Sequence, residues 1–304
     1  MKIKGLFTLV FLLVLAAVNI KAGNSVSKAE FKFMLGDTAV MVNVYEKPGS
    51  KITFFAPHYN EQTALKLAKE YIERKGGRVV EIQSFDEKGV PSRYLKFVSE
   101  GKTYNIDPNR IFTVNGRLCN FIASDIDITV KAFADNILKT IFINNGKNLR
   151  EGERILVAVH NNSDVDGKSD AAKLTDLTAV AFFKGDNTQR FSHGVFSEQA
   201  NGVFLSNTED DADNFVFLSD YTYMRHFSEK GFNVIVQKPS ASLQSKKCTI
   251  DDGSLSVYSG QQNIPYICLE ADGVNGSFRQ RQMLEAVYQI LQIKNETTAK
   301  EVKP

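Results

Sequence analysis

Short apolar runs rich in Val, Ile and Phe alternate with amphipathic segments along most of this chain of 304 residues. Two strand-like runs, 39–46 and 51–57, flank a Pro-Gly turn, and a helix-like run over 60–75 follows and stops at a Gly-Gly pair. The same order continues to a strand-like run over 264–272 and a terminal helix over 276–294. This alternation predicts an α/β fold with a mixed, mostly parallel sheet and helices on both faces.

The first 22 residues differ from the rest of the chain. Lys2 and Lys4 precede an apolar core over 6–18, and small residues follow at Ala22 and Gly23. This is the layout of a secretory signal peptide, and the apolar core is short for a membrane span; an uncleaved N-terminal anchor is the alternative. We therefore expect an exported protein, periplasmic or secreted, with no membrane insertion once residues 1–22 are removed.

The remaining chain is long enough for one α/β domain over residues 23–294, followed by a disordered tail over 295–304. The stretch 163–214 is polar and irregular, and we expect a long loop region there that forms the wall or cover of a site. Its first residues, 163–170, are oxygen-rich like a calcium loop. They lack the glutamate that closes an EF-hand, so a solvated loop is the favoured interpretation.

Charge and cysteine content exclude several classes of protein. The chain has a formal net charge of +2, and loss of three lysines with the leader leaves −1, so there is no electrostatic case for a nucleic-acid partner. Three cysteines are too few for a disulfide scaffold. Two alternatives stay open: one bridge between Cys248 and Cys268 with Cys119 free, or three free thiols.

Two of the four histidines follow or end apolar runs. His58 and Glu61 lie three residues apart after the second strand-like run, and His160 ends a later one. Because ligands of open α/β sheets sit beyond the carboxyl ends of strands, these side chains can meet. Two histidines and a glutamate suit a catalytic zinc ion with one position left for water. Taken alone, His58 and Glu61 favour the ordinary interpretation of a loop histidine and the first acid of a helix.

Three charged groups add to this pattern. Arg110, after Asn109, carries a planar fork suited to a substrate carboxylate, although a surface arginine in a turn is the alternative. Arg93 offers a second cation to a developing oxyanion. Glu270 ends an apolar strand, where poor solvation raises a carboxyl pKa into the range of a general base; a salt-bridging glutamate is the alternative.

Taken in order, these motifs resemble the carboxypeptidase A-like zinc metallopeptidases and their aspartoacylase and succinylglutamate desuccinylase relatives. The resemblance spans roughly residues 35–292 and rests on six residues: His58, Glu61, Asn109, Arg110, His160 and Glu270. It implies a zinc carboxypeptidase-like fold and one Zn²⁺ per chain, held by the two histidines and the first glutamate. It also implies that Arg110 grips the substrate carboxylate and that Glu270 activates a water molecule.

The chain also departs from the family pattern. Tyr59 stands where the family usually has a small residue, and Tyr258 is a candidate for the substrate-capping tyrosine only by its proximity to Glu270. The leading hypothesis is an exported zinc-dependent hydrolase that cleaves an amide bond in a small carboxylate-bearing peptide, cell-wall fragments included, or in an N-acyl amino acid. The alternative is a binding or structural protein that keeps the fold without catalysis.

Overall fold

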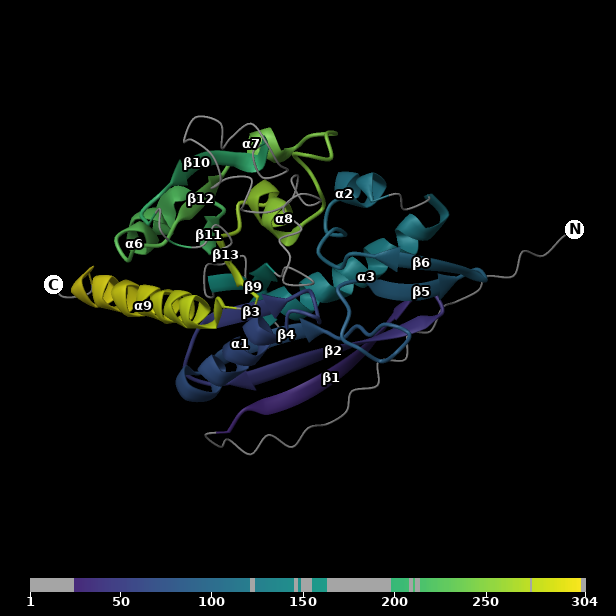
Figure 1. Cartoon of the computed structure of the whole chain (residues 1–304), viewed down its shortest axis with the longest axis horizontal. Helices are drawn as coiled ribbons and strands as arrows, with labels where there is room; N and C mark the ends of the chain where they lie inside the picture. The colour runs from purple at the N-terminus through teal and green to yellow at the C-terminus, as the bar shows by residue number, and fades with distance from the viewer. Residues whose placement is uncertain are drawn as a thin grey trace, which may run out of the picture.

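The part of the chain that the computed structural model describes comprises residues 25–120, 124–144, 147–148, 155–162, 198–207, 210, 214–273 and 275–301. The expected signal peptide and the segment 163–197 lie outside these residues. Nine described strands form one sheet in the order β1-β2-β4-β3-β9-β13-β11-β12-β10. Figure 1 shows this order as a colour sequence, from purple β1 and β2 at one edge to green β12 and β10 at the other.

The strands of this sheet have the bounds β1 Ser27–Leu35, β2 Thr38–Lys47, β3 Ile52–Ala56, β4 Gly77–Ile82, β9 Ile155–Asn162, β10 Ala200–Phe204, β11 Phe215–Leu218, β12 Val234–Gln237 and β13 Tyr266–Asp272. The central strands β4, β3, β9 and β13 are mutually parallel. Antiparallel pairs join β1 to β2, β2 to β4, β13 to β11 and β12 to β10. With β11 parallel to β12, parallel and antiparallel neighbours are equal in number. The sheet is therefore mixed, and the expected excess of parallel strands is confined to its centre.

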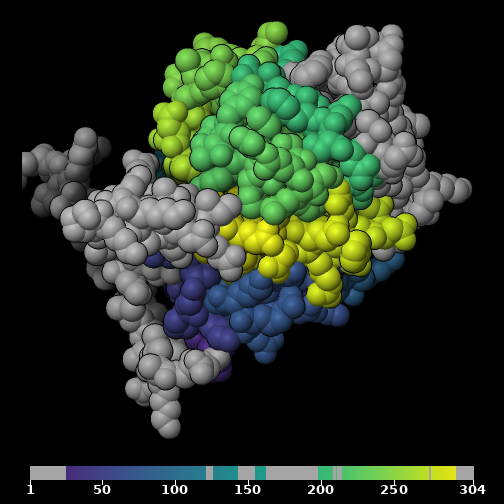
Figure 2. Space-filling model, turned by 90° about the vertical axis from the view of Figure 1, so that its left-hand side faces the viewer, coloured from purple at the N-terminus to yellow at the C-terminus, as the bar shows by residue number. Residues whose placement is uncertain are grey.

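Helices cover both faces of the sheet, as the alternation predicted. On one face α1 (Gln62–Lys75) and α9 (Ser277–Glu301) pack over Phe54, Val157 and Leu269. On the other, α3 (Ser124–Phe142) and α8 (Leu255–Gln261) pack over Phe55 and the alternate residues of the same strands. Because successive strand side chains point to opposite faces, each central strand contributes to both cores. Figure 2 shows α9, in yellow, between the blue N-terminal half and the green C-terminal half.

Helix α1 follows from its sequence pattern. Its buried residues recur at helical spacing and are Ala64, Leu65, Leu67, Ala68, Tyr71 and Ile72. The helix ends at Gly76, whose φ of +77° favours glycine. A side chain there would also meet the Pro48 carbonyl oxygen at 2.5 Å, so the strand-turn that precedes β3 packs directly on the helix end.

Shorter elements complete the described fold. Strands β5 (Leu95–Ser99) and β6 (Lys102–Ile106) form a hairpin whose two turn residues have positive φ, as a two-residue turn of this kind requires. The other elements are β7 Ile143–Asn144, β8 Lys147–Asn148, α2 Val114–Cys119, η3 Tyr221–Tyr223, α6 Met224–Ser228 and α7 Ser240–Leu243. Strand β6 ends at Ile106 and leads directly into Asp107.

Two segments differ from expectation. Strand β10 lies inside the stretch 163–214 that was expected to be irregular, and it pairs with β12 at the sheet edge. Helix α9 continues to Glu301, so most of the segment 295–304 is helical where a disordered tail was expected. Among the described residues, no helix has both the length and the apolar character to cross a membrane.

The cysteine pairing was predicted wrongly. A disulfide joins Cys119 at the end of α2 to Cys248 in the loop before α8, and Cys268 is a buried free thiol. Cys268 lies in the central strand β13, where its side chain points into the core and cannot reach the surface loop that carries Cys248. The bridge therefore clamps two peripheral segments, and the thiol is left inside the sheet.

Candidate metal centre

The carboxyl ends of β3, β9 and β13 bring the candidate residues to one edge of the sheet. His58 lies two residues beyond β3, and His160 and Glu270 are register partners on the adjacent parallel strands β9 and β13. His160 and Glu270 share a strand face with Ala158 and Cys268, which belong to the core beneath α3 and α8. The structure thus gathers residues that are more than 200 positions apart in sequence.

Three of these residues form a buried group with the donor atoms of a metal site. The ligand atoms of His58, Glu61 and His160 lie within 4.8 Å of one another. One carboxylate oxygen of Glu61 is 2.7 Å from His58 Nδ1, and the other is 3.0 Å from His160 Nδ1. The structure therefore brings together the three residues that the sequence suggested as ligands.

Glu61 reaches the histidines because another residue caps its helix. Glu61 is the N-cap of α1, but its side chain makes no cap hydrogen bond. Instead, the backbone N–H of Ala64 donates to the side-chain oxygen of Asn161 on β9, at 2.8 Å. Asn161 also donates its backbone N–H to Glu61 at 3.2 Å. One asparagine thus satisfies the helix end and holds the carboxylate in the site.

The carboxylate of Glu61 is held in its charged form. Burial favours the neutral acid, but the facing rings of His58 and His160 outweigh it and hold the pKa of Glu61 well below its usual range. Burial would likewise lower the pKa of His160, yet Glu61 and Glu270 raise that pKa above its ordinary value. The negative charges of Glu61 and Glu270 therefore favour a positive charge in the space between them, where His160 lies.

Asp107 fixes the orientation of His58 through the ring nitrogen that does not face Glu61. Its Oδ1 lies 2.8 Å from His58 Nε2 and accepts the backbone N–H of Asn109 at 2.8 Å. Burial raises the pKa of a carboxyl, but here His58 and Arg93 keep the pKa of Asp107 well below its usual range. A histidine that donates from one nitrogen to a carboxylate presents the other nitrogen as a ligand, the usual outer-shell arrangement of metal-binding histidines.

The donor set fits a divalent cation. In the tautomer that donates from Nε2 to Asp107, the His58 Nδ1 lone pair faces a Glu61 oxygen at 2.7 Å. A separation of 2.7 Å is that of a hydrogen bond, so a proton lies between these two atoms in the metal-free chain, and a metal ion would replace that proton. Two imidazole nitrogens and one carboxylate are a ligand set of catalytic zinc. His58, Glu61 and His160 would hold the ion, and Asp107 would support His58.

Glu270 and Cys268 lie beside this group. Glu270 is buried, and burial together with the charge of Glu61 raises the pKa of its carboxyl above the ordinary value, against the opposing effects of His160 and the Cys268 thiol. The Cys268 thiol donates to Glu270 Oε1 at 3.3 Å. A carboxyl with a raised pKa at the edge of a charged site has the properties of a general base or acid.

Arg93 lies at the mouth of the site. Its Nη1 donates to Glu61 at 3.3 Å, and its Nε and Nη2 donate to Asp107 Oδ2 at 3.2 and 3.0 Å. Although burial disfavours the charge, Asp107 and Glu61 raise the pKa of Arg93 above its ordinary value. Since its side chain is 36% exposed, the guanidinium also borders solvent. It is thus placed to face a ligand that approaches the metal group.

The expected substrate-binding residues lie in the same region but are engaged with the protein. Arg110 Nη1 is 2.9 Å from Asp252, and the Asn109 side-chain oxygen accepts the backbone N–H of Leu255 at 3.1 Å. Tyr258 packs against Phe142, with ring centroids 6.4 Å apart. Asn109 therefore fastens the start of α8, and Tyr258 contributes to the core. Of the three, Arg110 keeps the donors best suited to a ligand, because a guanidinium has five N–H groups.

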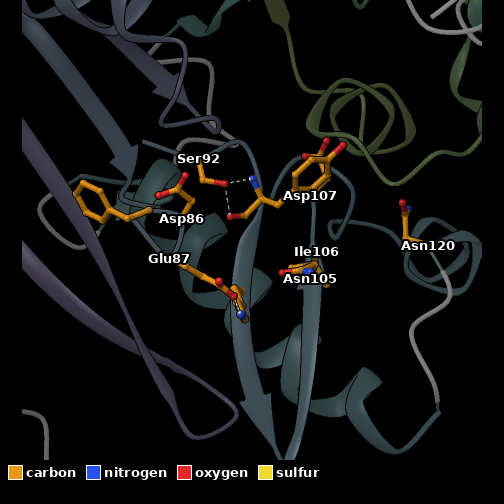
Figure 3. Close-up of a pocket in the computed structure, with 10 residues that line it drawn as sticks. Asp86, Glu87, Ser92, Asn105, Ile106, Asp107 and Asn120 are labelled. Atoms are coloured by element: carbon orange, nitrogen blue, oxygen red, sulfur yellow. Dashed lines mark hydrogen bonds and ion pairs between the residues drawn. The ribbon is translucent and has the colours of Figure 1, made fainter. Parts of the chain in front are cut away.

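A groove of about 480 Å³ opens next to Asp107. Figure 3 shows its lining, from Asp86 and Ser92 across the ends of β5 and β6 to Asn120 after α2. The exposed rings of Phe85 and Tyr94 border it as well. Pockets of this size hold small ligands. Asp107 lines this groove and contacts His58, whereas His58, Glu61, His160 and Glu270 are buried and are not part of the groove lining.

Sequence reasoning missed Asp107, Asn161 and Cys268. In the sequence Asp107 stands before Pro108, a pattern typical of a turn, and the position of Asn161 directly after His160 is the one signal for its role. Tyr59 does not crowd the metal group: its ring packs edge-on against Phe85 at 5.2 Å, and its hydroxyl accepts from Gln83.

Of the other two histidines, the one that the structure describes, His226, does not belong to this group. His226 donates to the Ala286 carbonyl at 2.8 Å and joins α6 to α9, consistent with a packing role. His193 lies outside the described residues.

Comparisons with known proteins add little to this geometry. No protein-family model matches the chain, and no curated protein matches it. Four chains of solved structures match. One of them is the 2.45 Å crystal structure of a "Putative metallopeptidase" from Shewanella baltica OS155, with 12% sequence identity and a TM-score of 0.35 over 86% of this chain and 84% of that chain. A likeness at this TM-score does not establish a shared fold or function.

Proposed function

We propose that this chain is an exported, zinc-dependent hydrolase of amide bonds. Its substrate is a small peptide or N-acyl amino acid with a free carboxylate, and cell-wall fragments belong to this class. The observation that carries the proposal is the buried group of His58, Glu61 and His160, backed by Asp107 and bordered by the Glu270 carboxyl. Zn²⁺ held there would act as a Lewis acid on the scissile carbonyl and lower the pKa of a water molecule.

The chain's own residues then divide the remaining work. Glu270, with its raised pKa, accepts a proton from the attacking water and returns it to the leaving amine. Arg93, held by two carboxylates at the mouth of the site, offers N–H donors to the negative charge that develops on the carbonyl oxygen. Arg110 binds the substrate carboxylate with the donors that Asp252 does not use.

Metal analysis of the purified mature chain is the first test. We expect about one zinc per chain, and we expect the His58→Ala variant to lose it. A chain without zinc that also takes up none on addition would refute the hydrolase and leave the non-catalytic binding protein as the better reading.

Two variants then test the roles within the site. Glu270→Gln should keep the metal and lose hydrolysis, whereas full activity in this variant would remove Glu270 from the mechanism. Arg110→Lys should raise KM for carboxylate-bearing substrates more than it lowers kcat, because the ammonium group cannot form a bidentate pair. A panel of C-terminal peptides and N-acyl amino acids would separate a peptidase from a deacylase.

A further inference from the structure

The thiol of Cys268 lies in the site but has no role in the proposed reaction. Cys268 lies two residues before Glu270 on the same face of β13, so it forms the floor beneath that carboxyl. Its side chain is buried, and its Sγ is 3.3 Å from Glu270 Oε1. The other two cysteines are joined to each other, which makes Cys268 the single free thiol of the chain.

Cys268 is part of a second group with the donors of a metal site. Ligand atoms of His160, Cys268 and Glu270 lie within 4.8 Å of one another, and all three residues are buried. His160 and Glu270 are register partners on the adjacent strands β9 and β13, and Cys268 lies two residues before Glu270 on β13. The group therefore stands on sheet backbone and places a thiol, a carboxyl and an imidazole close enough together to contact one ion.

We propose that Cys268, Glu270 and His160 form a second cation position that adjoins the first and takes thiophilic divalent ions. The probe ions are Cd²⁺ and Zn²⁺ in excess, since sulfur ligands favour them over Mg²⁺ and Ca²⁺, which prefer oxygen. On binding, the Cys268 thiol gives its proton to solvent and forms a sulfur–metal bond. His160 belongs to both groups, but its Nδ1 faces Glu61 in the first, so the ligands specific to the second position are Cys268 and Glu270.

This position has a consequence that rests on the proposed function. A Glu270 carboxylate that holds an ion cannot accept a proton from water, so an ion bound at the second position inhibits the hydrolase. Excess Zn²⁺ should therefore inhibit while the first ion is needed for activity. The metal-binding claim itself is independent of catalysis and can be tested without a substrate.

Cadmium titration of the full mature chain tests the position directly. We expect two Cd²⁺ per chain, together with a thiolate-to-cadmium charge-transfer band in the ultraviolet, which only Cys268 can supply. Cys268→Ser should remove the band and one Cd²⁺, and the Zn²⁺ concentration that halves activity should rise at least about tenfold. Glu270→Gln keeps the thiol and should weaken the second Cd²⁺ about tenfold, which gives an independent test if the serine variant does not fold.

The controls separate this proposal from the proposed function. His58→Ala should lose one Cd²⁺ but keep the band, because His58 belongs only to the first group. If His58→Ala loses no metal while Cys268→Ser loses all of it, the hydrolase fails and the second position stands. A wild-type chain that shows no band while its near-ultraviolet circular dichroism stays native, or a Cys268→Ser variant that keeps two Cd²⁺, overturns the second position.

Discussion

Asp107 controls the metal group from outside, and replacing it with asparagine tests that role. Its two carboxylate oxygens contact three groups at 2.8–3.2 Å: His58 Nε2, the Asn109 N–H and the Arg93 guanidinium. The amide of Asp107→Asn keeps the shape but turns one acceptor into a donor. If the NH₂ faces Arg93, two donors oppose each other. If it faces His58, it forces the imidazole proton onto Nδ1, the nitrogen that would bind the metal.

Either orientation should weaken metal binding by a predictable amount. Substitution of a carboxylate that orients a metal-bound histidine costs about 10–100-fold in metal affinity, which corresponds to about 1.4–2.7 kcal/mol. The assay is zinc competition against chelators of graded affinity, with a thermal melt to show that the variant is folded. Glu87→Gln is the matched control, because Glu87 lines the same groove but is exposed and paired with Lys96.

The outcome is decided by the difference between the two variants. Glu87→Gln should stay within about twofold of the wild-type affinity, as surface substitutions do. If a folded Asp107→Asn variant also stays within about twofold, His58 does not depend on Asp107, and the reasoning on its tautomer is wrong. Equal losses in both variants would point to the charge of the groove rather than to the contact.

Three further predictions concern stability. Burial lowers the pKa of His160, but Glu61 and Glu270 raise it overall; this stabilisation of the metal-free chain is present below the unfolded pKa of about 6.5 and lost as the pH rises through the higher folded pKa. The melting temperature of chelator-treated protein should therefore fall as the pH rises above about 6.5, and zinc should reverse the fall. Gly116→Ala places a methyl group 1.9 Å from the Gly253 backbone, so urea unfolding should show a loss of about 1–3 kcal/mol, and a variant as stable as wild type would contradict the close approach. Reduction of the disulfide, which closes a separation of 129 residues, should lower the free energy of unfolding by up to about 5 kcal/mol; thiol titration of the denatured, unreduced chain should find one thiol.

The sequence was sufficient for features that depend on local periodicity. Helix α1 and the central strands β3, β9 and β13 lie close to the predicted runs, because apolar spacing and glycine stops determine them locally. Strand ends in an α/β sheet gather at one edge, so His58, His160 and Glu270 could be placed together without coordinates. The edge strands β1 and β10 were missed because they carry few buried residues and so give weak alternation.

Features that depend on contacts between distant segments could not be predicted from local periodicity. The disulfide depends on where α2 and the loop before α8 meet, and neither has a strong periodic pattern. Asp107 precedes a proline and looks like a turn opener, yet its partner His58 is 49 residues away. Asp107 contacts His58 because the chain after β6 lies beside the chain after β3. The spacing of residues along the sequence does not reveal this neighbourhood.

The role of Glu61 shows how one contact changes the meaning of a motif. A glutamate at a helix start would ordinarily serve the helix end, where its charge and oxygens stabilise the first turn. Here Asn161 from β9 takes the Ala64 N–H, and its NH₂ donates to Gln280 of α9, which in turn donates to the His160 carbonyl. This chain of hydrogen bonds ties α1, β9 and α9 together and leaves the Glu61 carboxylate to the two histidines. The position of the Glu61 carboxylate beside the two histidines is thus supported by an asparagine 100 residues later in the sequence.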